Sequence, residues 1–437
     1  MKSRALIFAA VAIVFLAVIV TARLHAQDSP QPPGPPHYYV INLGNPGGGS
    51  SSLGNAINDL GWAMGASNLS GNVYQHATVW LPGSAADLGT LGGPNSAVPF
   101  TIRSNTGEVI GIAETAKPQP NNEAWSCDLA FFATITGDTC LGFVWKNGAM
   151  TPLSTLGGDN GFAASVNSAG QVVGWAETNV HDSTCASPQV LQFKAALWDP
   201  DGQIHALPQF GNDPDSAAVA INQQGQVVGI SGICDNAVGA YSAIHAVLWQ
   251  NGRVFYLGSI GGHGWNTPVS INDNGEVAGF ANASGDIVNG QLTFKFHAFL
   301  WTKERGMVDL GTLPGDALSE ATGINNQGQV VGTSFGANFT HPRAFIYQDG
   351  KMTPLNSLIA GNSTLSLAVT GDINDEGEIT GQAVDASTGE TPAFLAIPEQ
   401  SDDGWSQTPA NSASETLIEA PANMREMILR RHGLGSR

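Results

Sequence analysis

Short apolar runs of four to six residues recur along most of the chain, and each run is bounded by Gly, Asn, Asp or Pro. Alternating runs of this length predict β-strands, and the boundary residues are typical of turns. Three sequence elements, each about the length of one strand with its turn, repeat in a fixed order. A repeat of this kind indicates an array of similar units rather than several unrelated domains.

Each of the three elements occurs seven times, which indicates seven units. The Ile-Asn-x-x-Gly-x-Val-x-Gly element starts at Ile57, Ile102, Val166, Ile221, Ile271, Ile324 and Ile373, and in the second copy Arg103 replaces Asn. The Ala-x-x-Trp element, in stricter or looser form, starts at Ala77, Gly142, Ala195, Ala246, Ala298, Ala344 and Ala393. The Leu-Gly-Thr-Leu-Gly-Gly element starts, with variations, at Leu43, Leu88, Leu153, Leu207, Leu257, Leu310 and Leu355.

Every unit divides into four strands, and Asn-Gly or Asp-Gly pairs such as Asn147-Gly148 predict tight hairpins between the third and fourth. The repeated Asn is expected to cap its own turn. The order along the chain leaves one spare strand, 39–43, before the first unit, while the last unit lacks a fourth strand. If 39–43 pairs with 393–396, all seven sheets are complete. The sequence therefore predicts an all-β, seven-bladed β-propeller of four-stranded antiparallel blades, closed by the N-terminal strand.

The chain is expected to be exported. Lys2 and Arg4 precede an apolar run over residues 5–20, and Ala26 offers a cleavage site, so residues 1–26 read as a signal peptide, with an uncleaved anchor as the alternative. A Pro-rich spacer over 27–37 follows, the propeller is expected over 38–398, and a polar linker and tail over 399–437. No later segment is apolar enough to span a membrane, and we expect a secreted, periplasmic or cell-surface monomer.

The net charge of the chain limits which classes of binding partner are expected. The chain carries −19, and removing Lys2, Arg4 and Arg23 leaves 14 basic residues against 36 acidic ones, or about −22. Such a charge disfavours nucleic acid. No phosphate-binding loop, metal-ligand spacing or cofactor motif is present, so no metal or cofactor is expected.

The chain resembles the bacterial "probable extracellular repeat, HAF" family over residues 38–397. The resemblance rests on 297–301 (His-Ala-Phe-Leu-Trp), 307–313 (Met-Val-Asp-Leu-Gly-Thr-Leu) and 324–332 (Ile-Asn-Asn-Gln-Gly-Gln-Val-Val-Gly). It implies an exported repeat protein, and it brings no enzyme activity or ligand. The motif's histidine is kept at His76, His245 and His297, whereas Leu141, Lys194, Arg343 and Pro392 replace it elsewhere, which argues against a ring of histidine ligands.

In such blades the connections after strands two and four share one face, which we call the loop face. The connections after strands one and three share the other, the turn face. Long insertions follow strand two over residues 112–140, 175–193, 230–244 and 280–296, so the loop face is expected to bind ligands. Trp125, Trp175, Glu177 and Trp265 are the predicted ligand contacts, with packing beneath the loops as the alternative for the tryptophans.

All four cysteines lie in these insertions. An even number in an exported chain predicts disulfides, and we expect Cys127 to pair with Cys140 and Cys185 with Cys234.

Two functions from different classes remain open. The first is a non-enzymatic recognition propeller for a glycan or a cell-envelope or protein partner. The second is a glycan-active enzyme, a hydrolase or lyase, in which Glu114 and Glu177 act as paired catalytic carboxylates. The alternative role for these two acids is that of solvated loop residues. In the tail, residues 424–432 have the pattern of a short basic amphipathic helix, with a mobile end as the alternative.

Overall fold

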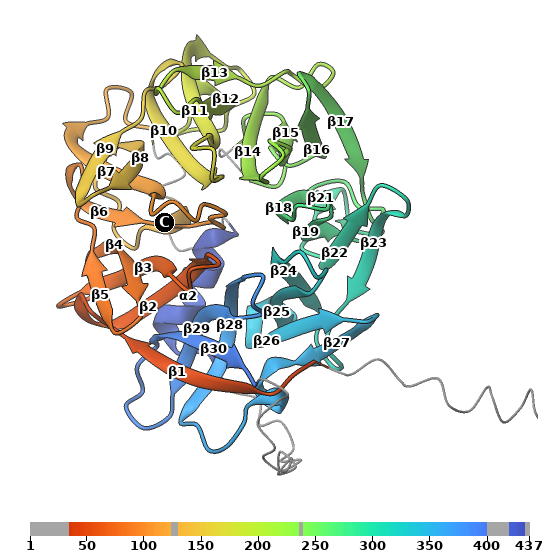
Figure 1. The fold of residues 1–437 in the computed structure, drawn as a ribbon. Coiled ribbons are helices and arrows are strands. Elements are labelled where there is room, and N and C mark those ends of the chain that lie inside the picture. The colour runs from red at the N-terminus through yellow and green to blue at the C-terminus, as the bar shows by residue number, and fades with distance from the viewer. Residues whose placement is uncertain (1–34, 124–129, 236–238, 400–418, 433–437) are drawn as a thin grey trace, which may run out of the picture. The chain divides into compact units, whose positions relative to one another are not determined.

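Seven four-stranded antiparallel sheets are arranged in a ring, as the repeat predicts (Figure 1). The computed structural model describes residues 35–123, 130–235, 239–399 and 419–432. The predicted signal peptide, residues 1–26, lies outside the described residues, as do Trp125 and Cys127.

In blades 1 to 6 the four strands follow one another outward from the ring centre in chain order, and in blade 7 the outermost strand comes from the N-terminus. The first strands are β2 (Gly48–Ile57), β6 (Gly92–Ala97), β10 (Gly157–Val166), β14 (Asp215–Ile221), β18 (Thr267–Ile271), β24 (Leu318–Ile324) and β28 (Leu365–Ile373). The second strands are β3 (Ala63–Leu69), β7 (Val109–Pro118), β11 (Val172–His181), β15 (Val227–Gly232), β19 (Val277–Asn282), β25 (Val330–Gly336) and β29 (Ile379–Asp385). The third strands are β4 (Gln75–Leu81), β8 (Asp138–Lys146), β12 (Leu191–Trp198), β16 (His245–Gln250), β22 (Phe296–Thr302), β26 (Thr340–Gln348) and β30 (Ala393–Pro398). The fourth strands are β5 (Ser84–Asp87), β9 (Ala149–Pro152), β13 (Ile204–Ala206), β17 (Arg253–Gly258), β23 (Gly306–Gly311), β27 (Lys351–Pro354) and β1 (Tyr38–Gly44).

Blade 1 is the sheet that begins with β2, and blades 2 to 7 follow in chain order. Outside the blades lie a small hairpin, β20 (Ile287–Val288) with β21 (Gln291–Leu292), two 3-10 turns, η2 (Ala337–Phe339) and η3 (Leu355–Leu358), and the helix α2 (Ala422–Arg431). No helix within the described ranges has the length and apolar character needed to cross a membrane.

The ring closes as predicted, because β1 supplies the fourth strand of blade 7. It pairs antiparallel with β30, in a register that sets Tyr39 opposite Ile397 and Val40 opposite Ala396. The side chain of Tyr38 is fully buried in the core of this blade. An unpaired edge at β30 is thereby covered, and the two ends of the repeat array hold each other in place.

The repeated Asn does more than cap its own turn. Asn222 Oδ1 accepts hydrogen bonds from two backbone N–H groups of its own turn, at Gln224 and Gln226. Its Nδ2 also donates to the backbone carbonyl of Asn272 in the next blade, at 3.0 Å. The same link to the next blade is made by Asn58, Asn167, Asn272, Asn325 and Asn374.

A second ring of hydrogen bonds lies on the turn face. In six blades its member is the residue directly after the repeated Asn, and in blade 2 it is Asn105. Each backbone N–H donates to the side-chain oxygen of the equivalent residue one blade further. The members are Asp59, Asn105, Ser168, Gln223, Asp273, Asn326 and Asp375, and Asp375 N–H donates to Asp59 Oδ1 at 3.0 Å. All seven links are present, so the hydrogen-bonded ring is continuous across the closure.

The last Gly of the repeated element is required by close packing within the blade. A Cβ on Gly174 would overlap with the backbone carbonyl oxygen of Phe162 on the neighbouring first strand. Equivalent overlaps occur at Gly65, Gly111, Gly229, Gly279, Gly332 and Gly381. The earlier Gly of the element has a positive φ, 79° at Gly170, which favours glycine.

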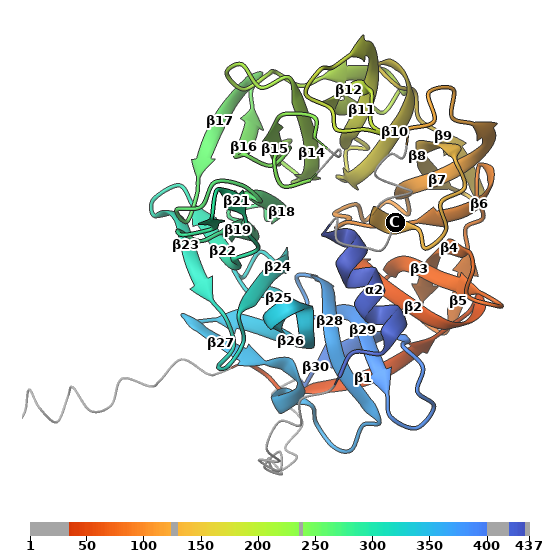
Figure 2. The same cartoon turned by 180° about the vertical axis from the view of Figure 1, so that it is seen from behind.

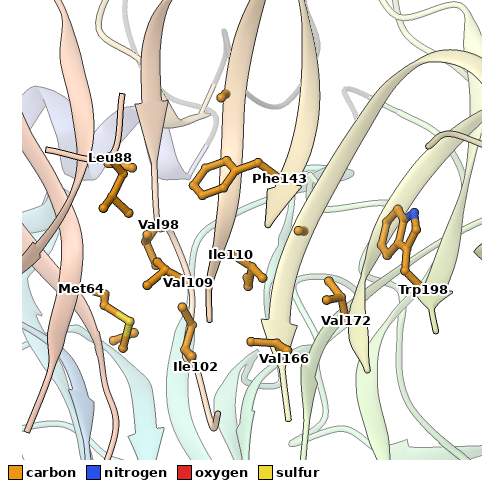
Figure 3. Close-up of a cluster of buried hydrophobic side chains, with 14 of the residues drawn as sticks. Met64, Leu88, Val98, Ile102, Val109, Ile110, Phe143, Val166, Val172 and Trp198 are labelled. Atoms are coloured by element: carbon orange, nitrogen blue, oxygen red, sulfur yellow. The ribbon is translucent and has the colours of Figure 1, made fainter. Parts of the chain in front are cut away.

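Apolar side chains fill the space between neighbouring blades. Figure 3 shows Met64 of blade 1, Phe143 of blade 2 and Trp198 of blade 3 in one buried cluster. The tryptophans of the third strands belong to this core, since Trp80, Trp198 and Trp249 are at most 3% exposed. Burial of these apolar clusters is the main force that holds the ring together.

Candidate functional site

Arg103, the residue that breaks the repeat, reaches across the centre of the ring near the turn face. Its guanidinium donates from Nη2 to Ser270 Oγ at 2.9 Å and to the backbone carbonyl of Ile324 at 2.8 Å. It also pairs with Asp372 Oδ1 at 3.2 Å. One side chain from blade 2 therefore ties together blades 5, 6 and 7, and the pocket left beside it has a volume of about 20 Å³. That is space for about one water molecule.

Asp372 is fully buried. Burial raises the pKa of its carboxyl to about 7, against the opposing effect of the Arg103 charge and of hydrogen bonds from backbone N–H groups. The pair is a structural bridge between distant blades. It lies under a closed hydrogen-bonded face, where a ligand has little access.

The loop face is organised around α2, which Figure 2 shows in front of the ring. Met424 and Ile428 of the helix are buried against loop-face aromatic residues, among them Phe339 of η2. Beyond the helix end, His432 stacks on Phe296 at 5.2 Å between ring centroids and contacts Glu320 through Nε2 at 3.1 Å. The sequence predicted a helix in this region, and the structure adds that it docks on the propeller.

A pocket of about 190 Å³ lies between α2 and the first two blades. It is lined by amide and hydroxyl side chains, by one aromatic ring and by charged residues of the helix. The lining residues that matter below are Asn55, Asn68, Gln75, Phe131, Gln382 and Arg431. The amide side chains of the lining carry both hydrogen-bond donors and acceptors.

Arg431 gives this pocket its electrostatic character. Its Nη2 donates to Asn55 Oδ1 at 3.0 Å, and its Cζ lies 5.9 Å from the centroid of the Phe131 ring. Burial lowers the pKa of the guanidinium to about 10, and nearby Glu320 opposes this shift. Arg431 therefore stays protonated at neutral pH, with a neutral amide as its hydrogen-bonded partner.

The predicted aromatic contacts lie beneath the loops. Trp175 is 1% exposed and stacks on Phe162 at 3.9 Å between ring centroids. Trp265 is 6% exposed and packs near His432, so α2 covers it. Both tryptophans occupy the packing position that the sequence left open as the alternative.

Glu114 and Glu177 are fully buried, and neither is a solvated loop acid. The second strands run further than predicted, to Pro118 in β7 and His181 in β11, so both acids lie within strands. Glu114 Oε2 accepts hydrogen bonds from the backbone N–H and the Nδ2 of Asn95, both at 3.0 Å.

Glu177 makes the equivalent pair of bonds with Asn160. Asn160 Oδ1 in turn accepts the backbone N–H of Cys140 in the preceding blade, at 3.0 Å. The two acids therefore hold the polar residues that fasten neighbouring blades together. Burial and the nearby Glu123 carboxylate raise the pKa of Glu177 to about 7, and hydrogen bonds from Asn160 and Gln189 oppose the shift.

The cysteine predictions are confirmed where the structure describes them. Cys185 and Cys234 form the predicted disulfide between blades 3 and 4. Cys140 also takes part in a disulfide, and Cys127, its predicted partner, lies outside the described residues.

The motif histidines pair with acids at the outside of the blades. His76 and His297 contact Asp87 and Asp309 of the neighbouring fourth strand, at 2.8 and 3.0 Å. Arg343, which replaces the histidine in blade 6, pairs with Asp316. The described residues contain no group of three or more side chains placed to hold a metal ion.

These features define a seven-bladed β-propeller with a pocket beside α2 on its loop face. A family model described as "Protein of unknown function (DUF3466)" matches residues 211–393. No curated protein matches the chain.

Solved structures resemble the chain at low identity. A streptogramin B lyase is 11% identical with a TM-score of 0.46, covering 83% of this chain and 98% of that one. The virginiamycin B lyase from Staphylococcus aureus is 12% identical with the same TM-score, covering 83% and 99%. A Trypanosoma rangeli sialidase is 7% identical with a TM-score of 0.37, covering 79% and 54%.

Proposed function

We propose that the chain is an exported recognition propeller, without catalytic activity of its own, that binds its ligand on the loop face. The observation that carries this proposal is the contrast between the pockets on the two faces of the ring. The turn face is closed by hydrogen-bonded side chains and Arg103 and leaves about 20 Å³, whereas the pocket beside α2 measures about 190 Å³.

The lining of the larger pocket supports a glycan or another hydroxylated cell-envelope component as the ligand. Amides such as Asn68 and Gln75 can exchange hydrogen bonds with hydroxyl groups, and the Phe131 ring offers an apolar surface. The volume is below the range of about 300–1,000 Å³ that is typical of drug-sized ligands, which suits one or two sugar residues. Trp125 remains a proposed contact on this face, and we propose that Trp175, Glu177 and Trp265 support the site from beneath.

The burial of the two candidate catalytic carboxylates favours ligand binding over catalysis. A glycan-active enzyme needs an acid pair that reaches the glycosidic bond. Glu114 and Glu177 are fully buried and engaged with Asn95 and Asn160. No observation specifically favours the enzymatic alternative.

A binding screen tests the proposal. The mature protein is offered an array of glycans and cell-envelope fragments, and the ligands found are measured again with two matched variants. Ala66→Trp fills the pocket, because Ala66 lines it. Ala149→Trp places the same side chain on an exposed outer strand. We expect Ala66→Trp to abolish binding and Ala149→Trp to retain it, with the melting temperatures of both close to wild type. Full binding by Ala66→Trp would place the ligand elsewhere.

A further inference from the structure

We propose that the pocket beside α2 selects a small, hydroxylated carboxylate, such as a sugar acid, and that the Arg431 guanidinium binds its carboxylate group. This inference rests on the proposed function, because it names the ligand class of the same pocket.

The position of Arg431 is fixed from two sides. Asn55 donates from Nδ2 to the backbone carbonyl of Val98 at 2.8 Å, which turns its Oδ1 toward Arg431 Nη2 at 3.0 Å. The Phe131 ring lies near the guanidinium at 5.9 Å. The side chain is thereby held in one place by an uncharged hydrogen-bond partner, and Glu320 acts on its charge without a hydrogen bond to it among the described residues.

Within the described residues, most of the hydrogen-bonding capacity of Arg431 is unused. A guanidinium carries five N–H donors in a planar fork that matches a carboxylate. Asn55 takes one of these donors. The nearby acid, Glu320, hydrogen bonds to His432 instead. A pocket-lining cation with a neutral amide as its partner favours an anionic ligand.

The charge balance of the lining favours a monoanion over a phosphate. Arg430 is 3.4 Å from Glu426 on the same helix, so these two charges offset each other. Arg430, Arg431 and Glu426 all line the pocket and together contribute a net charge of about +1. A phosphate dianion would exceed this charge and would approach the Glu426 carboxylate.

The remaining lining residues suit hydroxyl groups. Gln382 is 2% exposed and donates from Nε2 to the backbone carbonyl of Ser52 at 2.9 Å. This bond fixes the Gln382 amide in the wall of the pocket. Asn68 and Gln75 add further amides on the opposite wall. A sugar acid combines the carboxylate and the hydroxyl groups that this lining can bind.

The test uses titration calorimetry on the mature full-length chain with D-glucuronate, D-glucose and inorganic phosphate as probes. We expect glucuronate to bind at least about tenfold more tightly than glucose or phosphate. Arg431→Met should reduce glucuronate binding to the level of glucose. Arg425→Met is the matched control, because Arg425 is an exposed arginine of the same helix that does not line the pocket.

A second variant leaves the helix untouched. Gln75→Glu adds a negative charge to the β4 wall, and it should weaken glucuronate binding about tenfold while leaving glucose binding unchanged. The inference is overturned if glucose or phosphate binds as tightly as glucuronate. It is also overturned if the ligand found by the array screen binds Arg431→Met with full affinity. In either case the loop-face function still stands if Ala66→Trp abolishes binding, and it fails separately if Ala66→Trp binds normally.

Discussion

Restoring the repeat consensus at Arg103 should destabilise the protein, although Asn is the residue found at six of the seven equivalent positions. Arg103→Asn removes the contacts with Ser270, Ile324 and Asp372 across the centre of the ring. Removing one partner of a buried ion pair typically costs about 3–5 kcal/mol.

The loss should depend on pH, because Asp372 can take up a proton. Burial raises the pKa of Asp372 to about 7 even with Arg103 present, and without the guanidinium it should rise further. At about pH 8 the variant either keeps a buried, unpaired Asp372 carboxylate or takes up a proton at a pH where protonation is unfavourable. Either way the full cost of about 3–5 kcal/mol applies. At about pH 5.5 Asp372 is neutral, and only the lost hydrogen bonds remain, at about 1–2 kcal/mol.

Urea unfolding followed by tryptophan fluorescence at both pH values measures this difference. Arg305→Asn, at an exposed arginine in the turn between β22 and β23, is the matched control and should change stability by less than about 0.5 kcal/mol. If Arg103→Asn is as stable as wild type, or loses the same amount at both pH values, the bridge does not contribute as described.

Three further predictions concern other parts of the chain. Glu177 has its pKa raised from 4.5 to about 7 in the folded protein, so its contribution to stability is present below about pH 4.5 and is lost as pH rises through 7. In urea unfolding, Glu177→Gln should remove up to about 3 kcal/mol of this pH dependence, and an unchanged slope would contradict the assignment. Ile428→Ala should speed proteolysis of α2 while hardly changing the melting temperature of the ring, which is closed by β1, and a large drop in melting temperature would make the helix part of the fold. Replacing Cys185 and Cys234 by Ser should cost about 4 kcal/mol in thermal or urea unfolding, because their sequence separation of 49 closes a long loop in the unfolded chain, and an unchanged midpoint would refute this estimate.

The fold could be predicted because each unit repeats the same local requirements. The turn Asn, the Gly against the neighbouring strand and the spare strand at the N-terminus all reflect contacts within or between adjacent units. The Cys185 to Cys234 disulfide joins neighbours in the same way. Requirements of this kind can be recognised in a single sequence, because the seven copies of the unit can be compared with one another.

The candidate site could be predicted only as a face of the propeller. Arg103 contacts blades that are far apart in the sequence, so the contacts themselves could not be predicted. The sequence showed only that Arg103 replaces the Asn of the repeat. The docking of α2 depends on side chains of blades 1, 5, 6 and 7, which no spacing in the tail reveals. The position of Arg431 follows from that docking. Glu114 and Glu177 were assigned to loops because their strands extend beyond the repeated motif.

The most direct test of the loop-face proposal is hydrogen exchange mass spectrometry with and without the ligand found by the array screen. We predict slower exchange over residues 50–55, 66–75 and 423–431, which line the pocket beside α2. The turn-face ring around Asp59, Gln223 and Asp375 should exchange at the same rate in both states. Protection of the turn-face ring, with no change in the pocket beside α2, would contradict the proposal.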